Sequence, residues 1–304
     1  MVGRNILEHS DASKYDFIAP SRQELDLADA GHTSRFIADC KPDVVIHAAG
    51  LVGGIQANLA HPVDFLVTNL DLGRNVILAA RCAGVPRLVN LASSCMYPRN
   101  SPNPLGEHLL LQGELEPTNE GYALAKIFAT RLCQFINRES EASGVGSLSY
   151  KTLIPCNLYG RYDKFEPQHS HLIPAIIHKI HSAKEKKLAE VDIWGDGLAR
   201  REFMYAGDLA DVVLQAVCNF NSLPDLMNVG LGFDYSINEY YATAAEVIGW
   251  QGEFINDTTK PVGMKQKLVD NALQLAWGWE SSTTLATGIT KAYQYYLAEL
   301  TNDL

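Results

Sequence analysis

The sequence is poor in basic residues and lacks any long apolar run, and each deficit argues against a class of protein. Its 25 Lys and Arg are outnumbered by 35 Asp and Glu, which gives a net charge of −10. A general nucleic-acid binder needs a basic face, so this balance argues against one. No stretch approaches the roughly 18 apolar residues of a membrane span, and the first residues show no signal-peptide pattern. We therefore expect neither a nucleic acid nor a membrane as a partner.

Cysteines are few and unclustered. Six occur, with no Cys-x-x-Cys spacing: Cys40, Cys82, Cys95, Cys133, Cys156 and Cys218. This scatter is not typical of a disulfide framework or a zinc site, so we expect no metal. We expect most of these cysteines to be small buried side chains in a reducing cytoplasm.

Hydrophobic residues make up 47% of the 304 residues, and in the first half they alternate between strand-like and helix-like segments. The segments predicted as strands are residues 15–19, 41–50, 86–97 and 148–160, and those predicted as helices are residues 33–40, 61–84 and 121–140. Apolar strands separated by helices are typical of a parallel sheet covered on both faces. Right-handed crossovers then make the sheet doubly wound, so the expected fold class is α/β.

The pattern changes at about residue 161, where a polar loop and a helix are followed by short strands, a glycine turn and further helices. We interpret residues 1–160, with a returning segment near 203–220, as a cofactor-binding domain. Residues 161–202 and 221–304 would form a smaller C-terminal α/β lobe. Such a lobe would close over a ligand at the carboxyl edge of the sheet.

The opening "MVGRNIL" is similar to the end of a phosphate-binding turn that runs into a helix. Gly3 is followed by polar Arg4 and Asn5 and then by apolar Ile6. In a doubly wound fold a strand and earlier glycines precede such a turn, and the printed sequence has neither. We therefore expect that the first strand is missing and that the natural chain starts earlier. A frayed helix with a chance glycine is the alternative.

Two local patterns carry candidate chemistry. Tyr122 and Lys126 lie four residues apart near the start of a predicted helix, so they share one face. A nearby ammonium stabilises the phenolate, which lowers the pKa of Tyr122 and lets it exchange a proton near neutral pH. Ser93 and Cys95 follow a buried strand, where a doubly wound fold places its reactive groups. Taken singly, both patterns also occur on ordinary helix surfaces and strand ends.

Together, Ser93, Tyr122 and Lys126 resemble the extended short-chain dehydrogenase/reductase superfamily, whose fold is Rossmann-like. Longer motifs closely resemble one nucleotide-sugar-modifying branch, the GDP-L-fucose synthase family. These motifs are "HAAGLVGGIQAN", "SSCMYP", "LLQGELEPTNEGYALAKI", "IPCNLYG", "HSHLIPAIIHKIH" and "REFMYAGDLA". The resemblance runs from Met1 to about residue 298, with the motifs in the same order and spacing.

The resemblance implies an NADP-dependent enzyme that is both an isomerase and an oxidoreductase. Such enzymes invert C3 and C5 of GDP-4-keto-6-deoxy-D-mannose and reduce its C4 ketone with NADPH, giving GDP-L-fucose. Cys95 and His171 would be the acid and base, since a thiol and an imidazole both exchange protons near neutral pH. Ser93 and Tyr122 would hold the C4 oxygen, and Tyr122 would protonate it. Lys126 would lower the Tyr122 pKa and hold the nicotinamide ribose.

The sequence also indicates which dinucleotide cofactor is bound. An NAD site usually has an acidic residue after the second strand, whereas Arg22 follows here and suits the 2′-phosphate of NADP. A surface charge in a turn is the alternative for Arg22. The cofactor-binding residues expected are Gly3, Arg22, Ala48, Ala49, Gly50, Val52, Asn69, Tyr122 and Lys126.

By resemblance, the GDP part of the substrate meets Asn157, Lys179, Trp194, Arg201 and Lys267. An arginine can pair with a pyrophosphate through two hydrogen bonds. Some relatives carry Arg at the place of Lys179. The family also implies a homodimer in which the helices at residues 63–80 and 122–136 pair with their copies. Both segments carry more apolar residues than one sheet-facing stripe requires.

Three other functions stay open. GDP-L-colitose synthases apply the same chemistry to a 3,6-dideoxy substrate, in which only C5 is inverted. A nucleotide-sugar 4-epimerase would share Tyr122 and Lys126 but would not need Cys95 and His171. A truncated, non-catalytic dinucleotide-binding relative would keep the fold without turnover.

Overall fold

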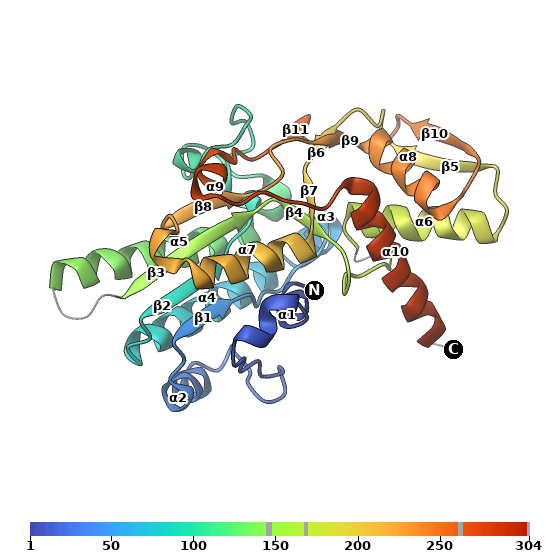
Figure 1. The fold of residues 1–304 in the computed structure, drawn as a ribbon. Helices are drawn as coiled ribbons and strands as arrows, with labels where there is room; N and C mark the ends of the chain where they lie inside the picture. Colours follow the sequence, from blue (N-terminus) through green and yellow to red (C-terminus); the bar gives the residue numbers. More distant parts are fainter. Residues whose placement is uncertain (144–147, 167–169, 261–263, 303–304) are drawn as a thin grey trace.

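The structure is a computed structural model, and it describes residues 1–143, 148–166, 170–260 and 264–302 (Figure 1). Figure 1 shows a larger part built around one sheet and a smaller part beside it. Among the described helices, none is both long enough and apolar enough to cross a membrane.

The larger part is built on four parallel strands, β1 (Val44–His47), β2 (Arg87–Leu91), β3 (Ser149–Pro155) and β8 (Leu226–Val229). They pair in the order β1-β2-β3-β8. Strands β2 and β3 are buried at nearly every residue, as expected for a sheet covered on both faces. Strand β1 forms an edge and is half-buried at three of its four residues.

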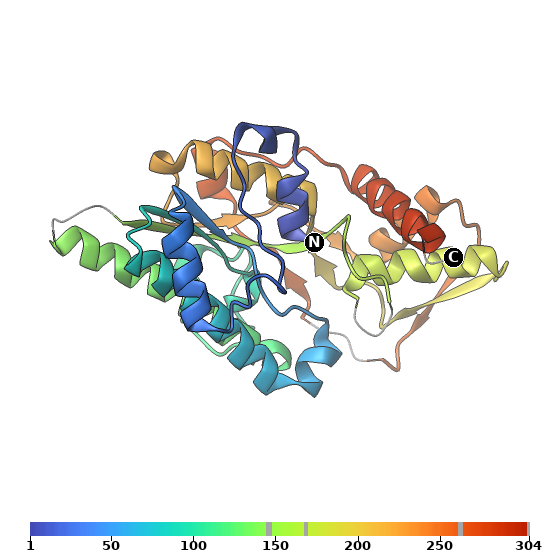
Figure 2. The same ribbon diagram turned by 90° about the horizontal axis from the view of Figure 1, so that it is seen from below.

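Helices cover both faces of this sheet (Figures 1 and 2). On one face lie α2 (Ala30–Cys40), α4 (Pro62–Cys82) and α5 (Glu120–Ser143), which pack against one another. On the other face lie α1 (Val2–Leu7) and α7 (Ala206–Cys218), also in contact. The predicted doubly wound α/β fold is therefore confirmed, as are the helices predicted at residues 33–40, 61–84 and 121–140.

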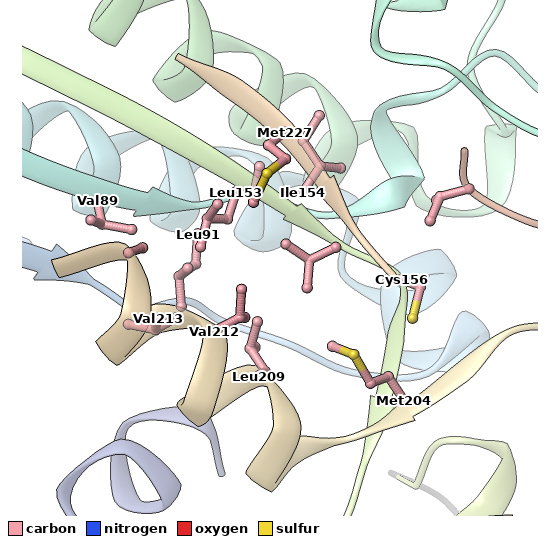
Figure 3. Close-up of a cluster of buried hydrophobic side chains, with 14 of the residues drawn as sticks. Val89, Leu91, Leu153, Ile154, Cys156, Met204, Leu209, Val212, Val213 and Met227 are labelled. Carbon is pink, nitrogen blue, oxygen red and sulfur yellow. The ribbon is translucent and has the colours of Figure 1, made fainter. Parts of the chain in front are cut away.

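The main core fills the space between the sheet and α7. Figure 3 shows side chains of α7 directed toward those of β2 and β3. The buried residues that it labels are Val89, Leu91, Leu153, Ile154, Cys156, Met204, Leu209, Val212, Val213 and Met227. Close packing of these side chains fixes where each strand ends. The strand ends therefore form a rigid base for the loops that follow them.

The smaller part has its own cluster of buried hydrophobic residues. Its helices are α6 (Leu172–Glu185), α8 (Ile237–Ile248) and α10 (Leu285–Asn302). They accompany a two-stranded parallel sheet of β5 (Glu190–Trp194) and β10 (Glu253–Asp257). The local sequence specifies α8 well. Ser236 and Glu239 form a reciprocal capping box, and Gly249 takes the left-handed conformation at its end.

Short strands join the two parts. The pair β4 (Asn157–Tyr159) and β7 (Phe203–Tyr205) continues from β3. Strand β6 (Arg200–Arg201) lies between β11 (Gln266–Lys267) and β9 (Tyr235–Ser236). The remaining elements are α3 (Ile55–Ala60), α9 (Ala272–Trp277) and the 3-10 helices Ser10–Lys14, Ser94–Met96, Glu107–Leu109, Pro117–Asn119 and Phe220–Ser222.

All four predicted strands differ from the structure in place or length. Those expected at residues 41–50 and 86–97 are shorter, at Val44–His47 and Arg87–Leu91, and Ser94–Met96 is a 3-10 helix. The strand expected at residues 15–19 is wrong, because this stretch has no regular structure and pairs with no strand among the described residues. Tyr15 and Phe17 instead pack their side chains against the main core, which explains the apolar pattern. The strand expected at residues 148–160 is interrupted at Cys156, which separates β3 from β4.

Candidate active site

The carboxyl end of β2 and the first turns of α5 bring together four of the predicted catalytic residues. Strand β2 ends at Leu91, and Ser93 Oγ then accepts a hydrogen bond from Cys95 N at 3.4 Å. Lys126 Nζ donates to Leu91 O at 3.0 Å and lies 5.7 Å from the centre of the Tyr122 ring. The Cys95 thiol acts electrostatically on both Tyr122 and Lys126. These side chains therefore meet at one edge of the sheet.

The electrostatics of Tyr122 and Lys126 differ from the expectation. Burial raises the pKa of the Tyr122 phenol, and the neighbouring Cys95 thiol raises it further. Burial also lowers the pKa of Lys126 to about 8. The pKa of Tyr122 is therefore raised rather than lowered in this structure, and the lowering effect expected of Lys126 stays a prediction. The physical reason is that burial dominates, while the ammonium is held by the carbonyl of Leu91.

Cys95 lies within the field of two cations. It is buried, and burial raises the pKa of its thiol. The ammonium group of Lys267, the hydrogen bond with Ser93 and the ammonium of Lys126 all act in the opposite direction. Nearby cations favour the thiolate, which is the form that accepts a proton. Burial outweighs these effects, so the pKa of Cys95 stays raised and the neutral thiol is its resting form.

His171 lies on a different element, directly before α6, where it is the N-cap residue. Burial raises the pKa of the Asp163 carboxyl and His171 lowers it, so the two side chains are within electrostatic reach. Asp163 Oδ2 is buried without a hydrogen-bond partner in the described part of the chain. Within those same residues, no hydrogen bond joins His171 to Cys95 or Tyr122. His171 therefore lies near a carboxylate, without a hydrogen bond or ion pair to it among the described residues.

The loop after β1 carries the residues expected to contact the middle of a dinucleotide. Asn69 Oδ1 accepts from Leu51 N at 2.8 Å, and its Nδ2 donates to Leu51 O at 3.0 Å, which fixes the loop on α4. A Cβ on Gly50 would lie 3.2 Å from Asn69 Oδ1 and 3.7 Å from Lys126 Nζ. Gly50 thus keeps the space in front of Lys126 open. Ala48 and Ala49 are half-buried on the same loop, and Val52 is exposed.

Two other cofactor candidates have no comparable contacts. Arg22 is exposed and forms no hydrogen bond or ion pair with any residue that the structure describes, so its role toward a 2′-phosphate stays a prediction. Gly3 lies in α1, where an added Cβ would meet nothing within 4 Å. That Gly3 binds the cofactor stays a prediction.

Three of the predicted substrate residues meet where the two parts join. Lys267 of β11 pairs in register with Arg201 of β6, and Asn157 Nδ2 donates to Glu202 O at 2.9 Å. Burial lowers the pKa of both Arg201 and Lys267. Within the described residues neither side chain forms an ion pair, and the Arg201 guanidinium donates to the carbonyl of Arg200 at 2.7 Å. Two adjacent, partly buried cations of this kind are suited to an anion.

Lys179 and Trp194 lie on the smaller part. Lys179 Nζ forms an ion pair with Asp192 Oδ1 at 2.7 Å and donates to Asp192 O at 2.5 Å. Lys179 would have to leave this carboxylate to reach a pyrophosphate. Trp194 is 57% exposed on the same face of β5 as Asp192, and Lys260 Nζ lies 5.6 Å from its ring centre. An exposed indole offers a surface for stacking against a base.

The sequence-based reasoning missed Asp163, Glu202, Asn58 and Asn119. A cavity of about 100 Å³ beside Tyr122 is lined in part by Asn58 and Asn119. The Oδ1 atoms of both are buried with no partner among the residues described. Two free acceptor oxygens favour a ligand that donates hydrogen bonds. The signal was present, because Asn58, Asn119 and Glu202 stand inside the motifs "GGIQAN", "EPTNEG" and "REF".

Comparison with known proteins gives this site a family context. The profile of the NAD dependent epimerase/dehydratase family matches residues 1–230. The chain is 52% identical over 303 residues to the GDP-L-colitose synthase of Yersinia pseudotuberculosis, covering 100% of this chain and 97% of that protein. It is 47% identical over 297 residues to a GDP-L-fucose synthase of Azorhizobium caulinodans, covering 98% and 93% of the two chains.

Solved structures agree with these relatives. A GDP-mannoheptose C4 reductase from Campylobacter jejuni with NADP bound has a TM-score of 0.85 and 32% identity. The match covers 97% of this chain and 95% of that chain. Both the profile and the relatives extend over the strand ends and α5, which carry Ser93, Cys95, Tyr122 and Lys126. The chain therefore belongs to the NAD dependent epimerase/dehydratase family.

Proposed function

We propose that this chain converts GDP-4-keto-6-deoxy-D-mannose to GDP-L-fucose by 3,5-epimerisation and NADPH-dependent reduction of the 4-keto group. The observation that carries the proposal is the meeting of Ser93, Cys95, Tyr122 and Lys126 at one sheet edge. The 47% identity to a GDP-L-fucose synthase supports the reaction. The likeness to a reductase with NADP bound supports the cofactor.

The chain's own residues would handle the protons of this reaction. Ser93 and Tyr122 would donate hydrogen bonds to the C4 oxygen, which becomes an enolate oxygen when a proton leaves C3 or C5. Cys95 and His171 would remove and return protons on opposite faces of the ring, which inverts each carbon. NADPH, when bound, supplies the hydride that reduces C4. Tyr122 would then give its proton to the C4 oxygen.

The surroundings of the two acid–base residues suit these roles. Lys267 and Lys126 oppose the effect of burial on the pKa of the Cys95 thiol. Asp163 lies within electrostatic reach of His171 and has an unpartnered acceptor oxygen. A carboxylate beside an imidazole fixes which ring nitrogen carries the proton. Asp163 would therefore orient His171 for proton transfer.

The GDP moiety would lie across the junction. Arg201 and Lys267 would hold its diphosphate, and Trp194 would stack on its base. Asn157 would border this site, and Lys179 would join it only after leaving Asp192.

Each part of the chain has its own role in this proposal. Residues 1–160, with 203–220, would bind NADP, and residues 161–202 and 221–304 would bind the nucleotide sugar. The second cluster of buried hydrophobic residues supports a separate lobe, while Met227 and Val229 of β8 pack in the main core with the first part. The six free cysteines suit a reducing cytoplasm.

A second candidate function is the formation of GDP-L-colitose, which the 52% identity to a GDP-L-colitose synthase favours. In that reaction the substrate has no hydroxyl at C3, and only C5 is inverted. The free acceptor oxygens of Asn58 and Asn119 beside Tyr122 favour a sugar that carries hydroxyl donors near C4. This geometry is the reason to place the 6-deoxy substrate first.

Product analysis distinguishes the two candidates. With NADPH and GDP-4-keto-6-deoxymannose we expect NADPH oxidation and GDP-L-fucose as the product, identified by NMR. The kcat/KM for this substrate should exceed that for its 3-deoxy analogue, because the analogue lacks a hydroxyl donor. A higher kcat/KM for the analogue would select GDP-L-colitose formation instead. No NADPH oxidation with either substrate would contradict both.

The substitution Tyr122→Phe tests the proton donor of the reduction. It removes only a hydroxyl, so the fold should persist while kcat falls by about 10²–10⁴-fold. The rate of NADPH oxidation measures the effect. Tyr150→Phe is a matched control, because Tyr150 is also buried but its hydroxyl donates to Val85 O, away from the site. Equal rates in both variants would remove Tyr122 from the mechanism.

The substitutions Cys95→Ser and His171→Gln separate epimerisation from reduction. Both should slow the exchange of the C3 and C5 hydrogens with solvent deuterium, while NADPH affinity stays close to that of the wild type. Incubation with substrate and oxidised cofactor in D₂O, followed by mass spectrometry, measures this exchange. If deuterium uptake is undiminished in both variants, neither residue is the acid or the base.

We also propose a homodimer that forms through α4 and α5. Val63 and Val67 lie one turn apart on α4 and are 68% and 49% exposed. Leu124 and Phe135 lie three turns apart on α5, so they share a face, and both are exposed. An exposed apolar face on two packed helices is typical of an interface.

Sedimentation tests the dimer. The wild type should sediment at twice the chain mass of 33.4 kDa, and Val67→Arg should shift it toward the monomer, because a charge would be buried without a partner. Leu188→Arg is the control, since Leu188 is equally exposed at 49% but lies on the smaller part. A wild type that is monomeric at micromolar concentration would reject the dimer.

A further inference from the structure

Glu202 is a carboxylate of unassigned role that is 1% exposed, between β6 and β7. Its Oε1 accepts hydrogen bonds from Leu231 N at 2.6 Å and Gly232 N at 3.1 Å, and its Oε2 accepts from Val269 N at 2.9 Å. Burial raises the pKa of Glu202 to about 7, against the opposing effect of these three donors. Removing the carboxylate would leave buried N–H groups without partners. Glu202 is therefore the centre of a tightly bonded cluster.

The bond to Val269 links the two cations of the proposed diphosphate site. Arg201 directly precedes the carboxylate in the chain, and Lys267 lies two residues before Val269, in register with Arg201. On its other side the same segment is held by Asn103, whose Oδ1 accepts from Leu268 N at 2.8 Å. The carboxylate thus sets how closely the segment that carries Lys267 approaches Arg201.

Arg201 and Lys267 repel each other, because they are like charges in a partly buried place. A bond that holds their two backbone segments together is therefore needed. The charge of Arg201 contributes to the lowered pKa of Lys267, after the larger effect of burial. In the absence of an anion the two cations would separate unless the backbone held them. Three backbone N–H groups donate to this one carboxylate, and these bonds oppose the repulsion.

Because Gly230 has no side chain, it leaves space for the Glu202 carboxylate. A Cβ on Gly230 would overlap Glu202 Oε1 and Val269 Cγ2. Its φ lies outside the left-handed region, so an alanine would be allowed by the backbone but not by the space. Gly230 is also fixed in place, because its N–H donates to Gln274 Oε1 at 2.8 Å and its carbonyl accepts from Gln274 Nε2 at 3.0 Å.

We propose that Glu202 is a positioning residue that holds Arg201 and Lys267 side by side to receive the diphosphate of a nucleoside diphosphate. This inference rests on the proposed function for the identity of the ligand. It adds a residue that does not touch the substrate and acts only through the two cations. Loss of the carboxylate should therefore weaken nucleotide binding and leave the catalytic cluster at Tyr122 in place.

The test compares Glu202→Gln with the wild type, using GDP alone as the probe in calorimetry. The amide retains only one acceptor oxygen, so one side of the cluster is lost, and we expect the Kd for GDP to rise about 10- to 100-fold. The Kd for NADPH should change less than twofold. In turnover, KM for the nucleotide sugar should rise by a similar factor while kcat changes less than threefold. A general loss of structure would not produce this split.

Two further variants keep the test decisive. Asp208→Asn is the matched control, because Asp208 is also buried and accepts from Thr283 N and from the hydroxyls of Ser281 and Thr283, none of which belongs to the segments that carry the cations. It should lower thermal stability without changing the Kd for GDP. Gly230→Ala should weaken GDP binding as Glu202→Gln does, because it displaces the carboxylate. It also provides the answer if Glu202→Gln does not fold.

The outcomes separate this inference from the proposed function. If the wild type binds GDP and Glu202→Gln binds it equally well, the positioning role is wrong. If GDP binding weakens as expected but the wild type does not turn over the 4-keto sugar, the positioning role stands and the proposed reaction fails. If the wild type does not bind GDP, both fail.

Discussion

The constraint on which the site depends is that all four strands of the main sheet are parallel. Their carboxyl ends lie at one edge, so the residues that follow each strand are brought together whatever their distance in the sequence. Gly50 follows β1, Ser93 and Cys95 follow β2, Asn157 follows β3, and Gly230 follows β8. The core beneath them contains tightly packed aliphatic side chains, which keeps the strand ends in register. The candidate catalytic residues and the loop expected to bind the cofactor therefore lie together because the strands are parallel.

The same edge must hold charges in a buried place, and it does so with main-chain groups. Lys126 donates to the carbonyl of Leu91, and Glu202 accepts from three backbone N–H groups. Hydrogen bonds to the backbone satisfy a buried charge without neutralising it. A side chain of opposite charge would satisfy it and also neutralise it. Arg201 and Lys267 are accordingly left without an ion pair in the described part of the chain. Lys179 differs from these two cations, because it already forms an ion pair with Asp192.

The α/β fold could be predicted from the sequence because strand burial and helix periodicity are local patterns. The irregular structure of residues 15–19 could not be predicted. Tyr15 and Phe17 pack through their side chains alone, and an apolar run looks the same in a sequence whether or not it pairs with another strand. The spacing of Tyr122 and Lys126 predicted where they lie, but not their pKa values, because burial is a property of the folded chain. Glu202 stands inside the motif "REF", but its hydrogen bonds could not be predicted, since its donors are 29 to 67 residues away.

The charge distribution explains how an acidic chain can hold an acidic ligand. The net charge of −10 belongs to the chain as a whole, while Lys126, Arg201 and Lys267 are concentrated at the strand edge and the junction. A local group of cations in a partly desolvated place attracts a compact dianion such as a diphosphate. This attraction exceeds the repulsion from the acidic surface, because interactions at short range and low dielectric dominate. An extended polyanion would gain little, since it must also lie along the acidic surface. The balance that argued against nucleic acid therefore agrees with a small nucleotide ligand, because a local group of cations at the junction can bind a small anion although the chain as a whole is acidic.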